Sequence, residues 1–75
     1  MREVIKFLET NGFKQEDIHN RYSNDKCTVI ILELRYCLTF KLDVDMTNIC
    51  SNDLNIYWLI GILTYYGLIN KEYKL

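Results

Sequence analysis

The residues of this chain that could do chemistry are few and widely spaced. Cys27, Cys37 and Cys50 are accompanied by a single histidine, His19. A zinc site normally needs a closely spaced cysteine pair and a fourth ligand, and the sequence contains no Cys-x-x-Cys. An odd number of cysteines also argues against a disulfide framework. We therefore expect free, buried thiols in a reducing compartment, and no bound metal ion.

Acidic and nucleophilic residues give no stronger signal. Asp43 and Asp45 would point the same way from a strand end, with Asp53 nearby, but no Asp-x-Asp-x-Asp-Gly calcium loop is present. The serine or threonine nearest to His19 in the chain is Ser23, and the two do not form a recognisable pair of nucleophile and base. All three glycines stand alone, so the chain has no glycine-rich phosphate loop. We expect neither a cofactor nor enzymatic activity.

Charge disfavours binding to nucleic acid. The formal net charge is −1, and the nine Lys and Arg residues are scattered along the chain. Binding to a phosphate backbone therefore lacks its usual electrostatic driving force. Tyr22, Tyr36 and Phe40 could stack on bases, which leaves a nucleic-acid binder as a third functional option.

Composition predicts one folded domain over residues 1–75. Apolar residues make up 49% of the chain and charged residues 25%, which is close to the norm for globular proteins. Amino acids with AT-rich codons are abundant, whereas Ala and Pro are absent, which indicates an AT-rich genome such as that of a low-GC bacterium, its phage or a mobile element. Arg2 and Glu3 precede a short apolar stretch that Lys6 interrupts, unlike a signal peptide, so we expect a cytoplasmic protein.

A short amphipathic helix is predicted at the start. Apolar residues at helical spacing between positions 4 and 8 alternate with charged ones, which indicates about ten helical residues. Gly12 can end this helix in the left-handed conformation, with Phe13 then packing on Leu8. Lys14 to Lys26 is polar apart from Ile18 and Tyr22, and we expect a loop or a short edge strand there.

Strict alternation predicts strand structure from Ile30 to Val44, where every even position is apolar. Extended from Cys27, this segment would reach about 60 Å, so it must fold back. A three-residue loop at residues 34–36 would keep the apolar residues on one face and set Leu32 opposite Leu38. No Gly or Asn marks this turn, so a bulged or bent strand stays open as the alternative.

The second helix is predicted from the longest uncharged run. Residues 54–70 contain no Asp, Glu, Lys, Arg or His, and they include the only Trp. A membrane span needs about 20 apolar residues, and this run is shorter and interrupted by polar and glycine residues, which favours a soluble core helix. Residues 45–52 are expected to be a connector, with Ser51, Asn52 or Asp53 as the N-cap.

The same helix is expected to end by the first helix's mechanism. It should run to about Tyr66, followed by Gly67 in the left-handed conformation, with Leu68 packing on Leu63.

Together these patterns predict an α+β fold. The expected order is an N-terminal helix, an antiparallel β-hairpin, and a C-terminal core helix packed on the sheet, with a third strand near Ile18 left open.

One stripe of the second helix has no obvious cover in this arrangement: Tyr57, Gly61 and Thr64 recur at i, i+4 and i+7. The stripe could pack on the first helix or the sheet, or it could dock another protein. The full set of candidate interaction residues is Tyr57, Gly61, Thr64, Trp58, Tyr65 and Tyr36.

We expect a non-catalytic protein-binding module, such as a phage or mobile-element inhibitor that occludes the surface of a host protein. The main alternative is a self-associating structural or accessory protein that forms a homodimer.

Overall fold

A computed structural model describes residues 2–17, 20–32, 35–42, 45–52, 55–70 and 72–74. The fold is α+β, with two helices and a five-stranded antiparallel sheet in the described residues. The expectation of a two- or three-stranded sheet was therefore wrong. The elements in chain order are α1 (Arg2–Thr10), β1 (Lys14–Gln15), β2 (Arg21–Ser23), β3 (Cys27–Leu32), β4 (Arg35–Leu42), β5 (Asp45–Ser51) and α2 (Ile56–Tyr65).

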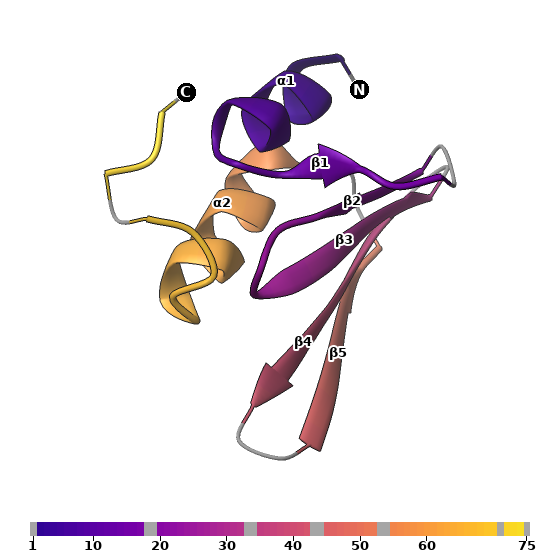
Figure 1. Cartoon of the computed structure of the whole chain (residues 1–75). Helices are drawn as coiled ribbons and strands as arrows, with labels where there is room; N and C mark the ends of the chain where they lie inside the picture. Colours follow the sequence, from indigo (N-terminus) through magenta and orange to yellow (C-terminus); the bar gives the residue numbers. More distant parts are fainter. Residues whose placement is uncertain are drawn as a thin grey trace.

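The sheet is a simple meander in which each strand pairs with its neighbour in the chain. Its order is β1-β2-β3-β4-β5, and every pairing is antiparallel. The short strand β1 lies at one edge beneath α1, and the seven-residue strand β5 forms the other edge (Figure 1). The β4–β5 hairpin extends well past α2, so the far end of the sheet projects from the molecule.

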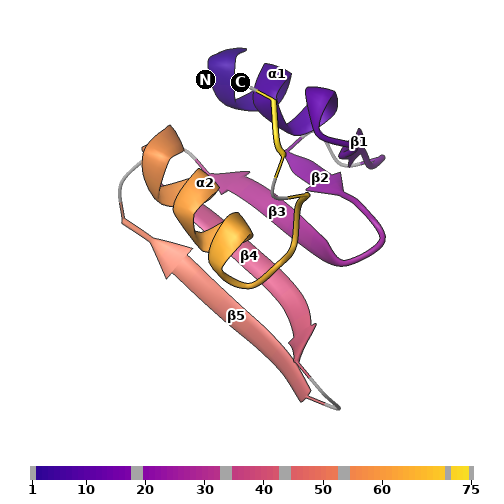
Figure 2. The ribbon, with the colours of Figure 1, turned by 90° about the vertical axis from the view of Figure 1, so that its left-hand side faces the viewer.

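Both helices lie on the same face of the sheet. Figure 2 shows α2 crossing in front of β3 and β4, while α1 lies over β1 and β2. The core fills the space between these two layers, and its most completely buried side chains are Tyr36, Leu8, Leu38, Leu59, Leu63 and Val29. The predicted packing of an apolar helix on an apolar sheet face is thus confirmed.

The end of α1 is confirmed as predicted. Gly12 has φ +91°, and the backbone N–H of Phe13 donates to the oxygen of Leu8 at 2.9 Å. This pattern is the Schellman motif, which satisfies carbonyl groups that the last turn of a helix would leave unpaired. Phe13 and Leu8 are both buried, so the motif also adds to the core.

The end of α2 repeats this motif, also as predicted. Gly67 has φ +67°, and Leu68 N–H donates to Leu63 O at 2.8 Å. The start of α2 differs from the prediction, because the N-cap is Asn55, whose side chain accepts a hydrogen bond from Tyr57 N–H. Ser51 lies in β5 instead, and Asp53 lies outside the described residues.

The register between β3 and β4 corrects the predicted hairpin. Leu32 pairs with Arg35, so a two-residue connection at positions 33 and 34 replaces the predicted loop at 34–36, and Leu38 lies opposite Val29, not Leu32. A two-residue connection switches the buried parity, so β3 buries its odd positions and β4 its even ones. The segment Cys27–Leu32 tolerates this because Val29 and Ile31 give it a second apolar face.

Residues 45–52 are not a connector, since Asp45–Ser51 form strand β5. Half-buried residues at positions 47, 49 and 51 alternate with exposed ones. This alternation is expected for a strand with one face on the core and the other in solvent. The prediction that Tyr22 is an apolar anchor of the polar segment from Lys14 to Lys26 is confirmed, because Tyr22 is buried in β2. Ile18, the other anchor, lies outside the described residues.

The segment after α2 returns to α1 (Figure 2). The side chain of Asn11 donates to the Lys74 oxygen at 2.7 Å and accepts from Lys74 N–H at 2.9 Å. The ring of Tyr73 packs edge-on against Phe7 with centroids 6.1 Å apart. This segment therefore borders the space between the two helices. Neither described helix has the length and hydropathy needed to cross a lipid bilayer.

Candidate protein-interaction surface

The side of α2 turned away from the sheet carries most of the predicted stripe. Leu59, Ile60 and Leu63 point into the core, because they recur at the spacing of one helical face. On the opposite side, Tyr57 is 78% exposed and Tyr65 is 80% exposed. We call the surface formed by Tyr57, Gly61, Thr64 and Tyr65 the outer face of α2.

Gly61 lies at the centre of the outer face, where neither a close contact nor the backbone conformation requires glycine. Apart from its chain neighbours and the adjacent backbone of its own helix, a β-carbon added there would meet no atom of the described chain within 4 Å, and the φ of Gly61 is not positive. Glycine in a helix interior costs about 1 kcal/mol relative to alanine. The fold therefore keeps a destabilising residue at an exposed position where a methyl group would fit.

The hydroxyl group of Thr64 already uses its hydrogen within the helix, so it adds no hydrogen-bond donor to this surface. Its hydroxyl lies 2.8 Å from the Ile60 oxygen and 3.0 Å from the Gly61 oxygen, so it donates within its own helix. No residue of Ile56–Tyr65 carries a formal charge. The outer face is thus an apolar and aromatic strip in which the tyrosine hydroxyl groups provide the polar sites.

Two hollows flank the strip. An open hollow of about 440 Å³ is lined by Gly61, Thr64, Tyr65 and Tyr73. A smaller one of about 290 Å³ lies against α1 and is lined by Glu3, Lys6, Phe7, Ile56, Tyr57 and Ile60. The outer face of α2 is therefore bordered by concave surface on two sides, toward α1 and toward the segment that follows α2. Sequence patterns did not indicate this, because the hollows depend on residues far apart in the chain.

Two of the predicted interaction residues lie elsewhere. Tyr36 has no exposed surface and belongs to the core, so it is not part of the outer face. Trp58 is half-buried, and its ring stacks on that of Tyr36 with a centroid distance of 6.3 Å and an interplanar angle of 4°. The structure thus brings Tyr36 and Trp58 together between sheet and helix, where they stabilise the fold.

The cysteines are not uniformly buried, contrary to the prediction. Cys27 lies in the core, Cys37 is half-buried and Cys50 is exposed. Cys37 and Cys50 lie on the sheet face turned away from both helices, with Ile30 and Leu32 of β3 half-buried in the same surface. Sequence reasoning missed this pair because it treated residues 45–52 as a connector.

The weaker sites considered from sequence gain no support. His19, Asp43 and Asp53 lie outside the described residues, and Asp45 is exposed at the start of β5. Within the described chain, no group of three or more His, Cys, Asp or Glu side chains is arranged to hold a metal ion. Comparison with protein-family models, curated proteins and solved structures found no match.

Proposed function

We propose that this protein is a non-catalytic binding module that docks the outer face of α2 onto a protein partner. The observation that carries the proposal is Gly61, an exposed helix glycine between two largely exposed tyrosines. Its cost of about 1 kcal/mol is offset by no internal contact in the described chain. A partner that approaches the helix backbone closely would explain why a side chain is missing there.

The chemistry of the outer face suits such a contact. Tyrosine is enriched at binding hot spots because it combines a large apolar ring with a hydroxyl and few rotatable bonds. A ten-residue helix is only about 15 Å long, whereas stable interfaces bury roughly 800 Å² per partner. The flanking hollows would therefore have to contribute, with Tyr73 and Phe7 at their borders.

As a biological role, we propose occlusion of a surface on a host protein by an inhibitor encoded by a phage or mobile element. Its support is the small size of the domain, the abundance of amino acids with AT-rich codons and the lack of any recognisable catalytic grouping in the sequence. An inhibitor of this kind needs only complementary surface, which the outer face would provide.

Homodimer formation is the second candidate. The observation that favours it is the absence of formal charge along Ile56–Tyr65. In a two-fold symmetric dimer the same patch faces itself, so a charged patch would repel its own copy whereas a neutral aromatic one would not.

Light scattering and partner capture with matched variants test both candidates. Tyr57→Asp places a charge on the outer face, while Met46→Asp places one at a 64% exposed position on the distant β5 strand. If α2 docks a host protein, a stoichiometric partner will be captured by the wild type and by Met46→Asp but not by Tyr57→Asp. If it forms a homodimer, only Tyr57→Asp will scatter as a monomer. A wild-type monomer at tens of micromolar that captures no partner would contradict both candidates.

A further inference from the structure

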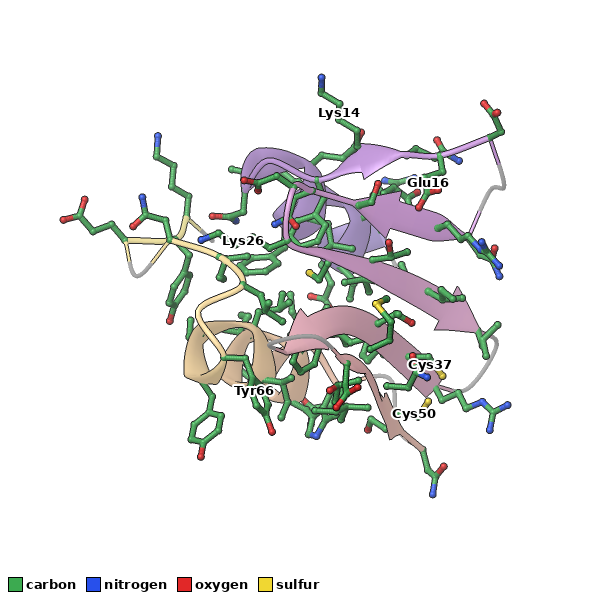
Figure 3. All side chains as sticks on the ribbon, turned by 60° about the horizontal axis from the view of Figure 1, so that its bottom comes forward. Lys14, Glu16, Lys26, Cys37, Cys50 and Tyr66 are labelled. Carbon is green, nitrogen blue, oxygen red and sulfur yellow. The ribbon has the colours of Figure 1, made fainter. Side chains whose placement is uncertain are left out.

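Cys37 and Cys50 occupy directly opposite positions on neighbouring antiparallel strands. Opposite Cα atoms in such strands are about 4.5 or 5.5 Å apart, and both values lie within the range of about 4.4 to 6.8 Å seen in disulfides. Figure 3 shows the two labelled side chains next to each other, one from β4 and one from β5. Closing a bond between them would require no change of strand register.

The two thiols already interact and differ in access. Cys50 is exposed, and its thiol hydrogen-bonds with that of the half-buried Cys37. An incoming reagent would therefore reach Cys50 first, with Cys37 placed beside it as the second thiol.

The charges around Cys37 favour this order of reaction. The hydrogen bond with Cys50 is the main cause that raises the pKa of the Cys37 thiol, followed by partial burial and the charge of Cys50, while Arg35 lowers it. Modification of Cys50 would remove its charge and the sulfur acceptor of the Cys37 S–H group but leave Arg35 in place. Cys37 would then ionise more readily, which is required because the thiolate is the attacking species.

We propose that Cys37 and Cys50 form a dithiol site that reacts with low-molecular-weight disulfides, such as glutathione disulfide, and closes as a cross-strand protein disulfide. In the first step the Cys50 thiolate attacks one sulfur of the reagent, forms a mixed disulfide and releases one thiolate. In the second step the Cys37 thiolate attacks the Cys50 sulfur and releases the other. Two protein thiols and one reagent disulfide thus become one protein disulfide and two reagent thiols, and the released thiolates take up the two protons.

Cys27 is a built-in control for this chemistry. It lies on the core side of β3 and is only 5% exposed. Burial, with a smaller contribution from the charge of Asp25, raises the pKa of the Cys27 thiol to about 12. A reagent in solution should therefore leave Cys27 unmodified in the folded protein.

The test is incubation of the folded, reduced protein with excess glutathione disulfide at pH 8, followed by alkylation, intact mass measurement and peptide mapping. We expect a loss of two hydrogens, a peptide link between Cys37 and Cys50, and a free Cys27. Because the disulfide closes the segment from Cys37 to Cys50, Tm should rise by roughly 5 to 15 °C. Two separate glutathione adducts, an unreacted pair, or a link that involves Cys27 would overturn the proposal.

Single substitutions test the order of the two steps. In Cys37→Ser the mixed disulfide on Cys50 cannot resolve, so a stable glutathione adduct should accumulate there. In Cys50→Ser the half-buried Cys37 should form its adduct at least tenfold more slowly than Cys50 does in Cys37→Ser. Equal adduct rates in the two variants would contradict Cys50 as the entry point.

Discussion

The side chain of Asn24, in the turn between β2 and β3, donates a hydrogen bond of 2.9 Å to the main-chain oxygen of Leu68. The same side chain accepts hydrogen bonds from the backbone N–H groups of Lys26 and Cys27. Lys26 adds a second link through its Nζ, which lies 3.3 Å from the Gly67 oxygen. One turn of the sheet is thereby fastened to the residues that end α2.

Two substitutions at Asn24 should separate the role of the turn from that of this link. Asn24→Ala removes all three hydrogen bonds and should lower the free energy of unfolding by about 2 kcal/mol. Asn24→Asp keeps the oxygen acceptor for the turn but loses the donor to Leu68, so its loss should be smaller. Urea denaturation followed through Trp58 fluorescence would measure both. An equal loss in the two variants would mean that the two hydrogen bonds accepted within the turn contribute nothing to the free energy of unfolding.

Gly61→Ala should stabilise the free protein. The position is helical and open, so alanine should add about 0.5 to 1 kcal/mol to the free energy of unfolding and raise Tm by several degrees. Gly67→Ala is the matched control, because its surroundings are equally open but its φ is +67°. This variant should be destabilised by about 1 kcal/mol, and thermal melts that showed the same sign for both would refute the reasoning.

Opposite faces of α2 should respond very differently to truncation. Leu63 has no exposed surface, so Leu63→Ala should cost about 2 to 5 kcal/mol through lost burial and a cavity. Tyr57 is 78% exposed, and Tyr57→Ala should change the stability by no more than about 0.5 kcal/mol. Chemical denaturation of the two variants would check this. A large loss from Tyr57→Ala would show that Tyr57 stabilises the fold, which would weaken its proposed role in binding.

Alkaline pH should destabilise the protein through Cys27. Its pKa rises from about 9 to about 12 on folding, so the folded state holds a proton that the unfolded state releases. The protonated Cys27 thiol therefore contributes to the free energy of unfolding. This contribution should fall as pH rises above 9, by up to about 1.4 kcal/mol per pH unit, and it is lost by pH 12. Below pH 9 it is fully present.

Denaturant titrations at pH 8 to 10.5 should show this slope in the wild type. Cys27→Ala serves as the control, because it removes the thiol but leaves every other titrating group in place. Identical slopes in the two proteins would mean that the Cys27 thiol ionises without cost in the folded state.

The parts of the fold that depend on neighbouring residues could be predicted from sequence. Both helix ends follow from a glycine at the C′ position and an apolar residue after it, and these interactions span only six residues. Gly12 and Gly67 therefore identified the two helix ends without knowledge of the rest of the fold.

The strand register could not be predicted in the same way. Residues 29–32 are apolar on both faces, so the sequence allowed either parity for β3. The prediction extends the apolar even positions of β4 back into β3, because the sequence shows no interruption between them. The pairing of Leu32 with Arg35 instead switches the buried positions from even in β4 to odd in β3. Strand β5 was missed for a related reason. It packs on the core along one face only, and Ile49 is its single large apolar residue on that face.

The candidate surface was predicted in part. The helical spacing of Tyr57, Gly61 and Thr64 placed them together, and the structure shows Tyr57 and Gly61 exposed and Thr64 half-buried. The burial of Tyr36 could not be foreseen, because it depends on which strand face meets α2. The pairing of Cys37 with Cys50 required the β4–β5 register.

The meander order of the sheet has a consequence for how the chain folds. Each described strand pairs with the one that precedes it, so the sheet can form by successive local hairpins with low loop-closure entropy, which favours fast folding. Helix α2 comes last in the chain and covers β3 and β4. During synthesis on the ribosome, the apolar face of these strands would stay open to water and to chaperones until residues 56–69 emerge.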